Sequence, residues 1–109
     1  MKERHVICPE RVRRIPESFS WIDREILHQG HLERLTQDEI LLYFFLTLVA
    51  GPEGTSFWGY RRIAKLLKLS EDQVLRATAG LLKKDLIDFL FPTYQVLSIP
   101  PSSASKEEP

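Results

Sequence analysis

The chain has 109 residues, of which 15 are basic and 15 acidic, so its formal net charge is zero. This length argues for one domain. A composition of 43% hydrophobic and 28% charged residues excludes a chain that is disordered throughout. The longest apolar stretch, residues 40–50, is far shorter than the roughly 20 residues that span a bilayer. One cysteine cannot form an intramolecular disulfide, and the first 14 residues hold no apolar run typical of a secretion signal. Together these features predict a small cytoplasmic domain with no membrane partner.

The charges are unevenly distributed along this neutral chain. Residues 1–14 hold five basic and two acidic groups, a net of +3, and residues 59–84 hold seven basic and two acidic groups, a net of +5. The other two segments, 15–58 and 85–109, are acidic. Such clustering favours a polyanionic partner more than the net charge does. A solvated helix face explains a basic block equally well.

The first elements are an arm and a short helix. Residues 1–17 predict an irregular basic arm, because its two prolines disfavour helix in the residues before them. Ser18 or Ser20 is a candidate N-cap for a helix over residues 21–29, and Gly30 is its candidate C-terminal stop.

A long apolar helix follows the short one. Thr36 and Glu39 have the spacing of a capping box, so we expect a helix from this point to about Ala50. Apolar residues occupy nearly every position from Ile40 onward, which predicts a central helix that is buried all round. After a glycine- and proline-rich turn, residues 55–58 predict a short strand.

Two helices joined by a tight connection come next. The first is expected over residues 60–67 and the second over residues 71–84. Ser70 and Gln73 form a second capping box at the start of the later helix. This pair is a candidate helix-turn-helix.

The end of the chain changes character. Residues 86–91 and 94–99 are rich in β-branched and aromatic residues, with Pro92 and Thr93 between them, which predicts a hairpin. No lysine or arginine occurs from residue 85 to residue 105.

The stretch YRRIAKLLKLSEDQVLRATAGLLKKDLI resembles the winged helix-turn-helix family, and the resemblance covers about residues 20–99. Ala64 is the small residue at which the two helices cross, Leu69 fills the turn and Val74 returns to the core. One departure is Lys68, since many members have glycine there, and a lysine must adopt a less favourable backbone angle. The inner face continues through Leu81, Leu82 and Leu86.

This resemblance implies a mainly α fold with a small β-hairpin, in which three or four helices form the core and the hairpin forms the wing. The domain would occupy residues 18–100, between the arm at 1–17 and a disordered polar tail at 101–109. The helical layout looks most like winged-helix domains of replication-initiation and mobile-element proteins.

The helix at 71–84 is the candidate recognition helix, whose outer face would lie in the major groove of duplex DNA. At about 100° per residue, its expected inner face consists of Val74, Leu75, Thr78, Leu81 and Leu82. Ala79 and Gly80 would keep its middle slim enough for close approach to DNA. The base-reading candidates are Gln73, Arg76 and Lys83. The phosphate-contact candidates are Arg61, Arg62, Lys65, Lys68 and Lys84. The basic-arm candidates are Arg11, Arg13 and Arg14.

These features predict a sequence-specific or semi-specific DNA-binding protein, either a transcriptional regulator or a replication or mobile-element accessory factor. The alternative is a winged-helix module for protein interaction or dimerisation that does not read DNA. The hairpin is apolar on both faces, so a homodimer through the hairpin and first helix is expected. Cover of the second face by Trp21 and Ile26 of the same chain is the competing explanation.

A metal site is not expected. His5 with Cys8, and His28 with His31, have spacings that metal ligands use, but structural zinc sites need four ligands and usually more cysteine. No nucleophile stands beside a base, and no glycine-rich phosphate loop is present. The sequence therefore predicts neither an enzyme nor a cofactor, and no small-molecule ligand is evident.

Overall fold

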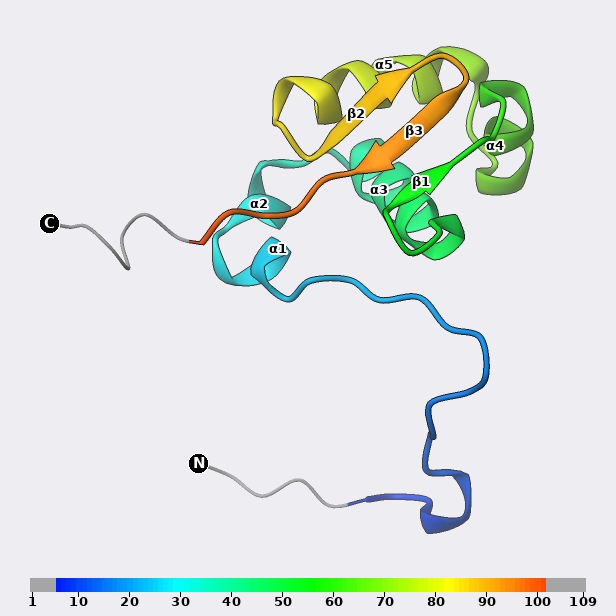
Figure 1. Cartoon of the computed structure of the whole chain (residues 1–109), viewed down its shortest axis with the longest axis vertical. Coiled ribbons are helices and arrows are strands. Elements are labelled where there is room, and N and C mark those ends of the chain that lie inside the picture. The colour runs from blue at the N-terminus through cyan, green and yellow to red at the C-terminus, as the bar shows by residue number, and fades with distance from the viewer. Residues whose placement is uncertain (1–5, 102–109) are drawn as a thin grey trace, which may run out of the picture.

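The computed structural model describes residues 6–101. Five α-helices and a three-stranded antiparallel sheet lie in this part of the chain, which confirms the predicted fold class. In chain order, after a single 3-10 turn at Pro9–Arg11, the elements are α1 (Glu25–His28), α2 (His31–Arg34), α3 (Gln37–Val49), β1 (Thr55–Ser56), α4 (Tyr60–Leu67), α5 (Glu71–Lys83), β2 (Ile87–Leu90) and β3 (Thr93–Val96). Figure 1 shows the strands lying across α3 and α5, with the N-terminal arm standing away from them.

The central helix α3 begins at the predicted capping box. The Glu39 amide donates to Thr36 Oγ1 at 3.1 Å, and the Thr36 amide donates to Glu39 Oε1 at 3.0 Å. Leu42 and Leu46 are fully buried, because α5 and β3 both contact this side of α3. The expectation of burial all round is wrong, since the opposite side faces solvent. Three side chains there are 40–53% exposed: Leu41, Phe44 and Leu48.

The first helix differs from the one predicted over residues 21–29. The helix α1 begins at Glu25, and no serine caps it; the Glu25 amide donates to Asp23 Oδ1 at 2.9 Å in the turn just before the helix. The expected cap Ser20 instead donates to a backbone carbonyl of α3. Gly30, with φ of 78°, ends this turn and leads directly into α2, which the sequence pattern did not predict. Local capping therefore shortens the helix and leaves residues 19–22 extended.

The sheet has the strand order β1-β3-β2. Its strands are shorter than expected: 55–56 rather than 55–58, and 87–90 with 93–96 rather than 86–91 with 94–99. Ser56 of β1 pairs with Tyr94 of β3, so the segment before α4 closes the hairpin into a three-stranded sheet. That long-range pairing has no local signal in the sequence.

One face of the hairpin is covered within the chain. Tyr94 is buried, its hydroxyl lies 3.2 Å from Thr78 Oγ1 of α5, and its ring lies 4.5 Å from that of Phe89. Of the two residues expected to cover the second face, Ile26 is buried, but Trp21 is 71% exposed. The part of that explanation that relies on Trp21 is therefore wrong.

The ends of the chain were assigned to an arm and a tail. Residues 6–17 are exposed throughout, whereas the predicted tail lies outside the described residues apart from Pro101. None of the helices within residues 6–101 is both long and apolar enough to cross a membrane.

Candidate nucleic-acid interface

The pair α4 and α5 is held at a close crossing by the residues that the sequence singled out. Ala64 is buried where the two helices meet, and the Leu69 amide donates to its carbonyl at 3.0 Å. Lys68 between the helices is left-handed, with φ of 60° and ψ of 41°, as expected for a position where glycine is common. The turn therefore has the predicted geometry and carries an exposed lysine.

The start of α5 is fixed by its capping box. The Gln73 amide donates to Ser70 Oγ at 3.0 Å, and the Ser70 amide donates to Gln73 Oε1 at 2.8 Å. The Gln73 Nε2 group also donates to Asp38 Oδ2 of α3 at 3.2 Å. Both polar ends of this side chain are thus engaged inside the protein, so Gln73 is poorly placed to pair with a base.

Two base-reading candidates remain on the outer face of α5. Arg76 and Lys83 are exposed, seven residues and about two turns apart. The Arg76 guanidinium lies 4.0 Å from Asp72 of the same helix. Because both groups face solvent, this ion pair is weak and screened by salt. Because the ion pair with Asp72 is weak, the Arg76 side chain can turn toward another acceptor.

Lys84 does not share that outer face. Its ammonium donates to Glu39 Oε1 of α3 at 2.6 Å, and its side chain is only one-third exposed. Glu39 is itself only 6% exposed. A buried carboxylate that loses its cation is costly to the fold. Lys84 therefore holds α5 against α3, and its availability for a phosphate is reduced.

Gly80 also faces α3, which corrects its expected place on the slim outer face. A Cβ at this position would overlap the Glu39 carboxylate. Glycine is therefore required for the close approach of Glu39 to α5, and not for an approach to DNA.

The inner face of α5 is rotated from the one expected. Val74, Thr78 and Leu81 are buried as expected, but Ala77 takes the remaining inward position. Leu75 and Leu82, expected in the core, are partly exposed. With Phe91 and Pro92 at the hairpin turn, they line a small apolar hollow of about 170 Å³.

Four cations lie along α4 and its C-terminus. Arg61 is 3.6 Å from Glu71, and Arg62 stacks over the Trp58 ring at 4.4 Å from its centroid. The Tyr60 side chain, and then the Glu71 carboxylate, raise the pKa of Arg61 above its ordinary value, so it stays charged. The other two, Lys65 and Lys68, are exposed. The cations of α4 and the two of α5 belong to adjoining, contacting helices.

The stacking of Arg62 on Trp58 was missed in the sequence, although the i, i+4 spacing of the two residues was visible. The contacts of Gln73 and Lys84 had no such signal, because their partners are 35 and 45 residues away.

The basic arm does not join this cluster. The chain leaves the body before α1, and Arg11, Arg13 and Arg14 are exposed on the extended segment (Figure 1). Of the four candidate metal ligands, His5 lies outside the described residues. Within residues 6–101, no group of three or more His, Cys, Asp or Glu side chains is placed to hold a metal ion.

A family model described as a helix-turn-helix domain matches residues 33–87, just over half of the chain. The match begins within α2, contains α3, β1, α4 and α5, and ends at the first residue of β2. No curated protein and no solved structure matches the chain.

Proposed function

Because this chain belongs to a helix-turn-helix domain family, we propose that it binds duplex DNA with α5 in the major groove. The observation that carries the proposal is a set of exposed cations on two helices that contact each other: Arg61, Arg62, Lys65, Arg76 and Lys83. Cations grouped on two adjoining helices give the phosphate attraction that dominates affinity for nucleic acids.

Within this face, the proposed roles follow the positions of the side chains. Arg76 and Lys83 project from α5 and are the proposed base contacts, since arginine and lysine pair with guanine in the major groove. The α4 cations and Lys68 are the proposed phosphate contacts, which set position without reading sequence. The internal bonds of Gln73 and Lys84 make them the weakest of the predicted contacts.

The test is binding to random-sequence duplex DNA across a salt series. Wild type is compared with the double variant Arg76→Ala, Lys83→Ala. Each phosphate contact adds about 0.9 to the slope of log affinity against log salt, so a second double variant that removes two proposed phosphate contacts, Arg61→Ala with Lys65→Ala, is expected to lower the slope by about 2. The Arg76, Lys83 variant is expected to lose affinity with little change of slope. If Arg76 pairs with guanine, the variant also loses preference at one position of a selected site.

A matched control removes two exposed arginines elsewhere, with Arg24→Ala and Arg34→Ala beside α1 and α2. This variant is expected to keep the wild-type slope. If the Arg61, Lys65 variant keeps the wild-type slope as the control does, the proposed phosphate contacts are wrong, and absence of binding at low salt would contradict the proposed function.

The second candidate function is a protein-interaction module. The apolar hollow between Leu75, Leu82 and Phe91 favours it, because a wing without cations offers nothing to a phosphate at that edge. If the folded wild-type protein does not bind DNA, the protein-interaction function is the better supported of the two.

The cellular role and the oligomeric state are further proposals. A cytoplasmic role in transcriptional control, or in replication or mobile-element maintenance, fits the family resemblance. The homodimer proposed from the sequence involves the region of the hairpin and the first helix. Ile26 is buried, whereas Trp21 before α1 and Leu90 and Phe91 of the hairpin are 71–83% exposed, so these residues are surfaces left for a second copy.

A further inference from the structure

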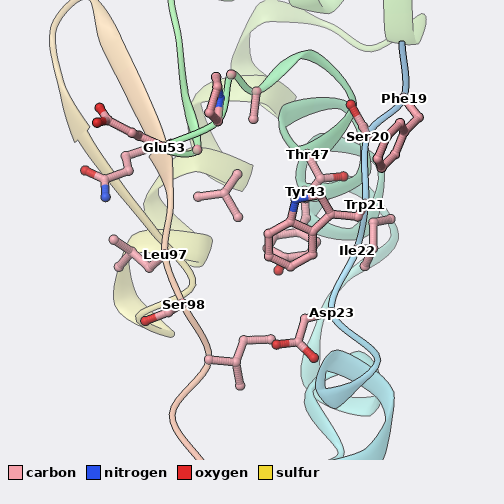
Figure 2. A pocket seen from close by; sticks show the side chains of 17 residues that line it. Phe19, Ser20, Trp21, Ile22, Asp23, Tyr43, Thr47, Glu53, Leu97 and Ser98 are labelled. Carbon is pink, nitrogen blue, oxygen red and sulfur yellow. The ribbon is translucent and has the colours of Figure 1, made fainter. Parts of the chain in front are cut away.

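A groove with a volume of about 650 Å³ separates two extended segments of the chain. Residues 19–23, which precede α1, form one wall, and residues 95–99, which include and follow the end of β3, form the other. Tyr43 and Thr47 of α3 lie between the walls (Figure 2). None of the residues that line the groove belongs to α4 or α5.

The charged side chains that line this groove are all acidic. Asp23 and Glu53 contribute carboxylates, and no lysine, arginine or histidine is among the described residues that line it. In Figure 2, Asp23 lies at the lower end and Glu53 at the upper left. Burial, and then the charge of Asp23, raise the pKa of Tyr43, which agrees with a negative potential here. A cationic occupant is therefore favoured.

An aromatic surface lies between the two carboxylates. In Figure 2 the Trp21 ring projects over the groove toward Tyr43. Trp21 is 71% exposed. An exposed tryptophan face attracts guanidinium groups through its π electrons. The same contact already forms elsewhere in this protein, where Arg62 stacks on Trp58. The groove thus suits an arginine-bearing segment with aliphatic neighbours.

The chain itself contains a segment of that composition. Residues 11–15 read Arg-Val-Arg-Arg-Ile, so three cations alternate with two aliphatic residues. All five are exposed, with Ile15 at 79%. The radius of gyration, 16.3 Å, exceeds the roughly 13 Å of a compact chain of this length, in line with an arm that stands away from the body. An extended segment with exposed Val12 and Ile15 leaves apolar surface in water that docking would bury.

We propose that the groove binds residues 11–15 of a second copy of this chain, so that two copies exchange their arms. This proposal specifies the homodimer proposed above and does not depend on DNA binding. Asp23 and Glu53 would attract the arginines, and Trp21 would stack against one guanidinium.

The occupant is a second copy because the arm is poorly placed to enter its own groove. The arm leads into residues 19–23, which already form one wall. To enter its own groove it would have to reverse direction within residues 16–18. Pro16 fixes its own φ and favours extended backbone at Ile15, so the chain is directed outward. When two copies related by a two-fold axis exchange their arms, each groove is occupied by the arm of the other copy.

The first measurement is the mass of the full chain in solution without DNA, by analytical ultracentrifugation over a concentration series. The expected species at high micromolar concentration has twice the chain mass of 12.7 kDa. Its dissociation constant is expected to rise with salt, because exposed charge contacts are screened. A strict monomer at all concentrations would overturn the proposal.

The decisive measurement is a charge exchange between arm and groove. Arg13→Glu with Arg14→Glu reverses the arm, and Glu53→Arg reverses one end of the groove. Asp23 is left unchanged because its carboxylate accepts a hydrogen bond from the Glu25 amide at the start of α1. Each change alone is expected to raise the dimer dissociation constant about tenfold, and their combination to restore much of the loss. Failure of the combined variant to recover would show that these groups do not meet.

A matched control reverses another adjacent arginine pair, with Arg61→Glu and Arg62→Glu on α4. This variant is expected to dimerise like wild type, and circular dichroism checks that all variants are folded. If the arm variant weakens DNA binding but leaves association unchanged, the arm belongs on DNA and the proposal is wrong. If instead no DNA binding is found in any variant, the association data still decide the proposal.

Discussion

Alanine at position 80 is expected to destabilise the fold, although alanine favours helices. Gly80 lies within α5, where an exposed Gly→Ala change would stabilise the helix by about 1 kcal/mol. Here the added Cβ would overlap the Glu39 carboxylate and displace it from its place against α5. Glu39 would then lose its hydrogen bonds with the Thr36 amide and the Lys84 ammonium.

The size of this effect follows from the contacts that are lost. A hydrogen bond to a charged group contributes about 1.5–3 kcal/mol. The lower end applies to Lys84, whose side chain is one-third exposed and therefore screened. Loss of both bonds, less the gain in helix propensity, gives a net destabilisation of about 2–3.5 kcal/mol for Gly80→Ala.

Urea denaturation monitored by circular dichroism measures this change. The matched comparison makes the same change in a Glu39→Ala variant, which lacks the carboxylate that a Cβ at position 80 would overlap. There, Gly80→Ala is expected to stabilise the protein by about 1 kcal/mol. If Gly80→Ala stabilises the wild-type background as well, the close approach of Glu39 to α5 is wrong and Gly80 lies on an open surface.

The remaining predictions concern single residues. Lys68→Gly is expected to raise the free energy of unfolding by about 1 kcal/mol, because a left-handed lysine is strained and glycine is not; an unchanged urea midpoint would argue against the left-handed turn. Burial, and then the charge of Asp23, raise the pKa of Tyr43. The stability that neutral Tyr43 contributes is therefore fully present below the pKa of a tyrosine in the unfolded chain, which is about 10. This stability is lost as pH rises through the higher pKa of the folded protein. Titration of tyrosinate absorbance should show an ionisation above the ordinary tyrosine value that Tyr43→Phe removes, and the absence of such a late step would contradict this.

Capping boxes and short-range spacing predicted the elements that form the helix-turn-helix. Thr36 with Glu39, and Ser70 with Gln73, are separated by three residues, so each box is complete within one turn of chain. The unfavourable backbone angle of Lys68 was implied by the family resemblance, because many members have glycine at this position of the turn. These features depend on local hydrogen bonds and backbone angles, which is why they were predictable.

The candidate DNA face could be predicted only in part. Helical periodicity placed Arg76 and Lys83 outward, but it could not determine the rotation of α5 to better than one residue. Ala77, not Leu75, therefore turned out to be the inner residue, because the inner face is selected by the shape of the space beside α3.

Contacts between distant segments account for the other differences. Glu39 approaches α5 closely enough to bind Lys84 and to require Gly80, although neither partner is near it in sequence. In the same way, Ser56 joins the sheet only through its pairing with Tyr94. Such pairings depend on the three-dimensional arrangement and leave no periodic pattern.

The sequence by itself determined the order of α3, α4 and α5, the capping boxes of α3 and α5, the hairpin and the clustering of positive charge on the arm and the helix pair. Each of these follows from neighbours within a few residues or from a count of charges. The tertiary structure alone decided which side of α3 faces solvent, which polar groups of α5 are engaged inside the protein, and where the groove beside Trp21 opens. Those features depend on how separate segments pack, since burial is a property of a side chain's surroundings and not of its position in the sequence.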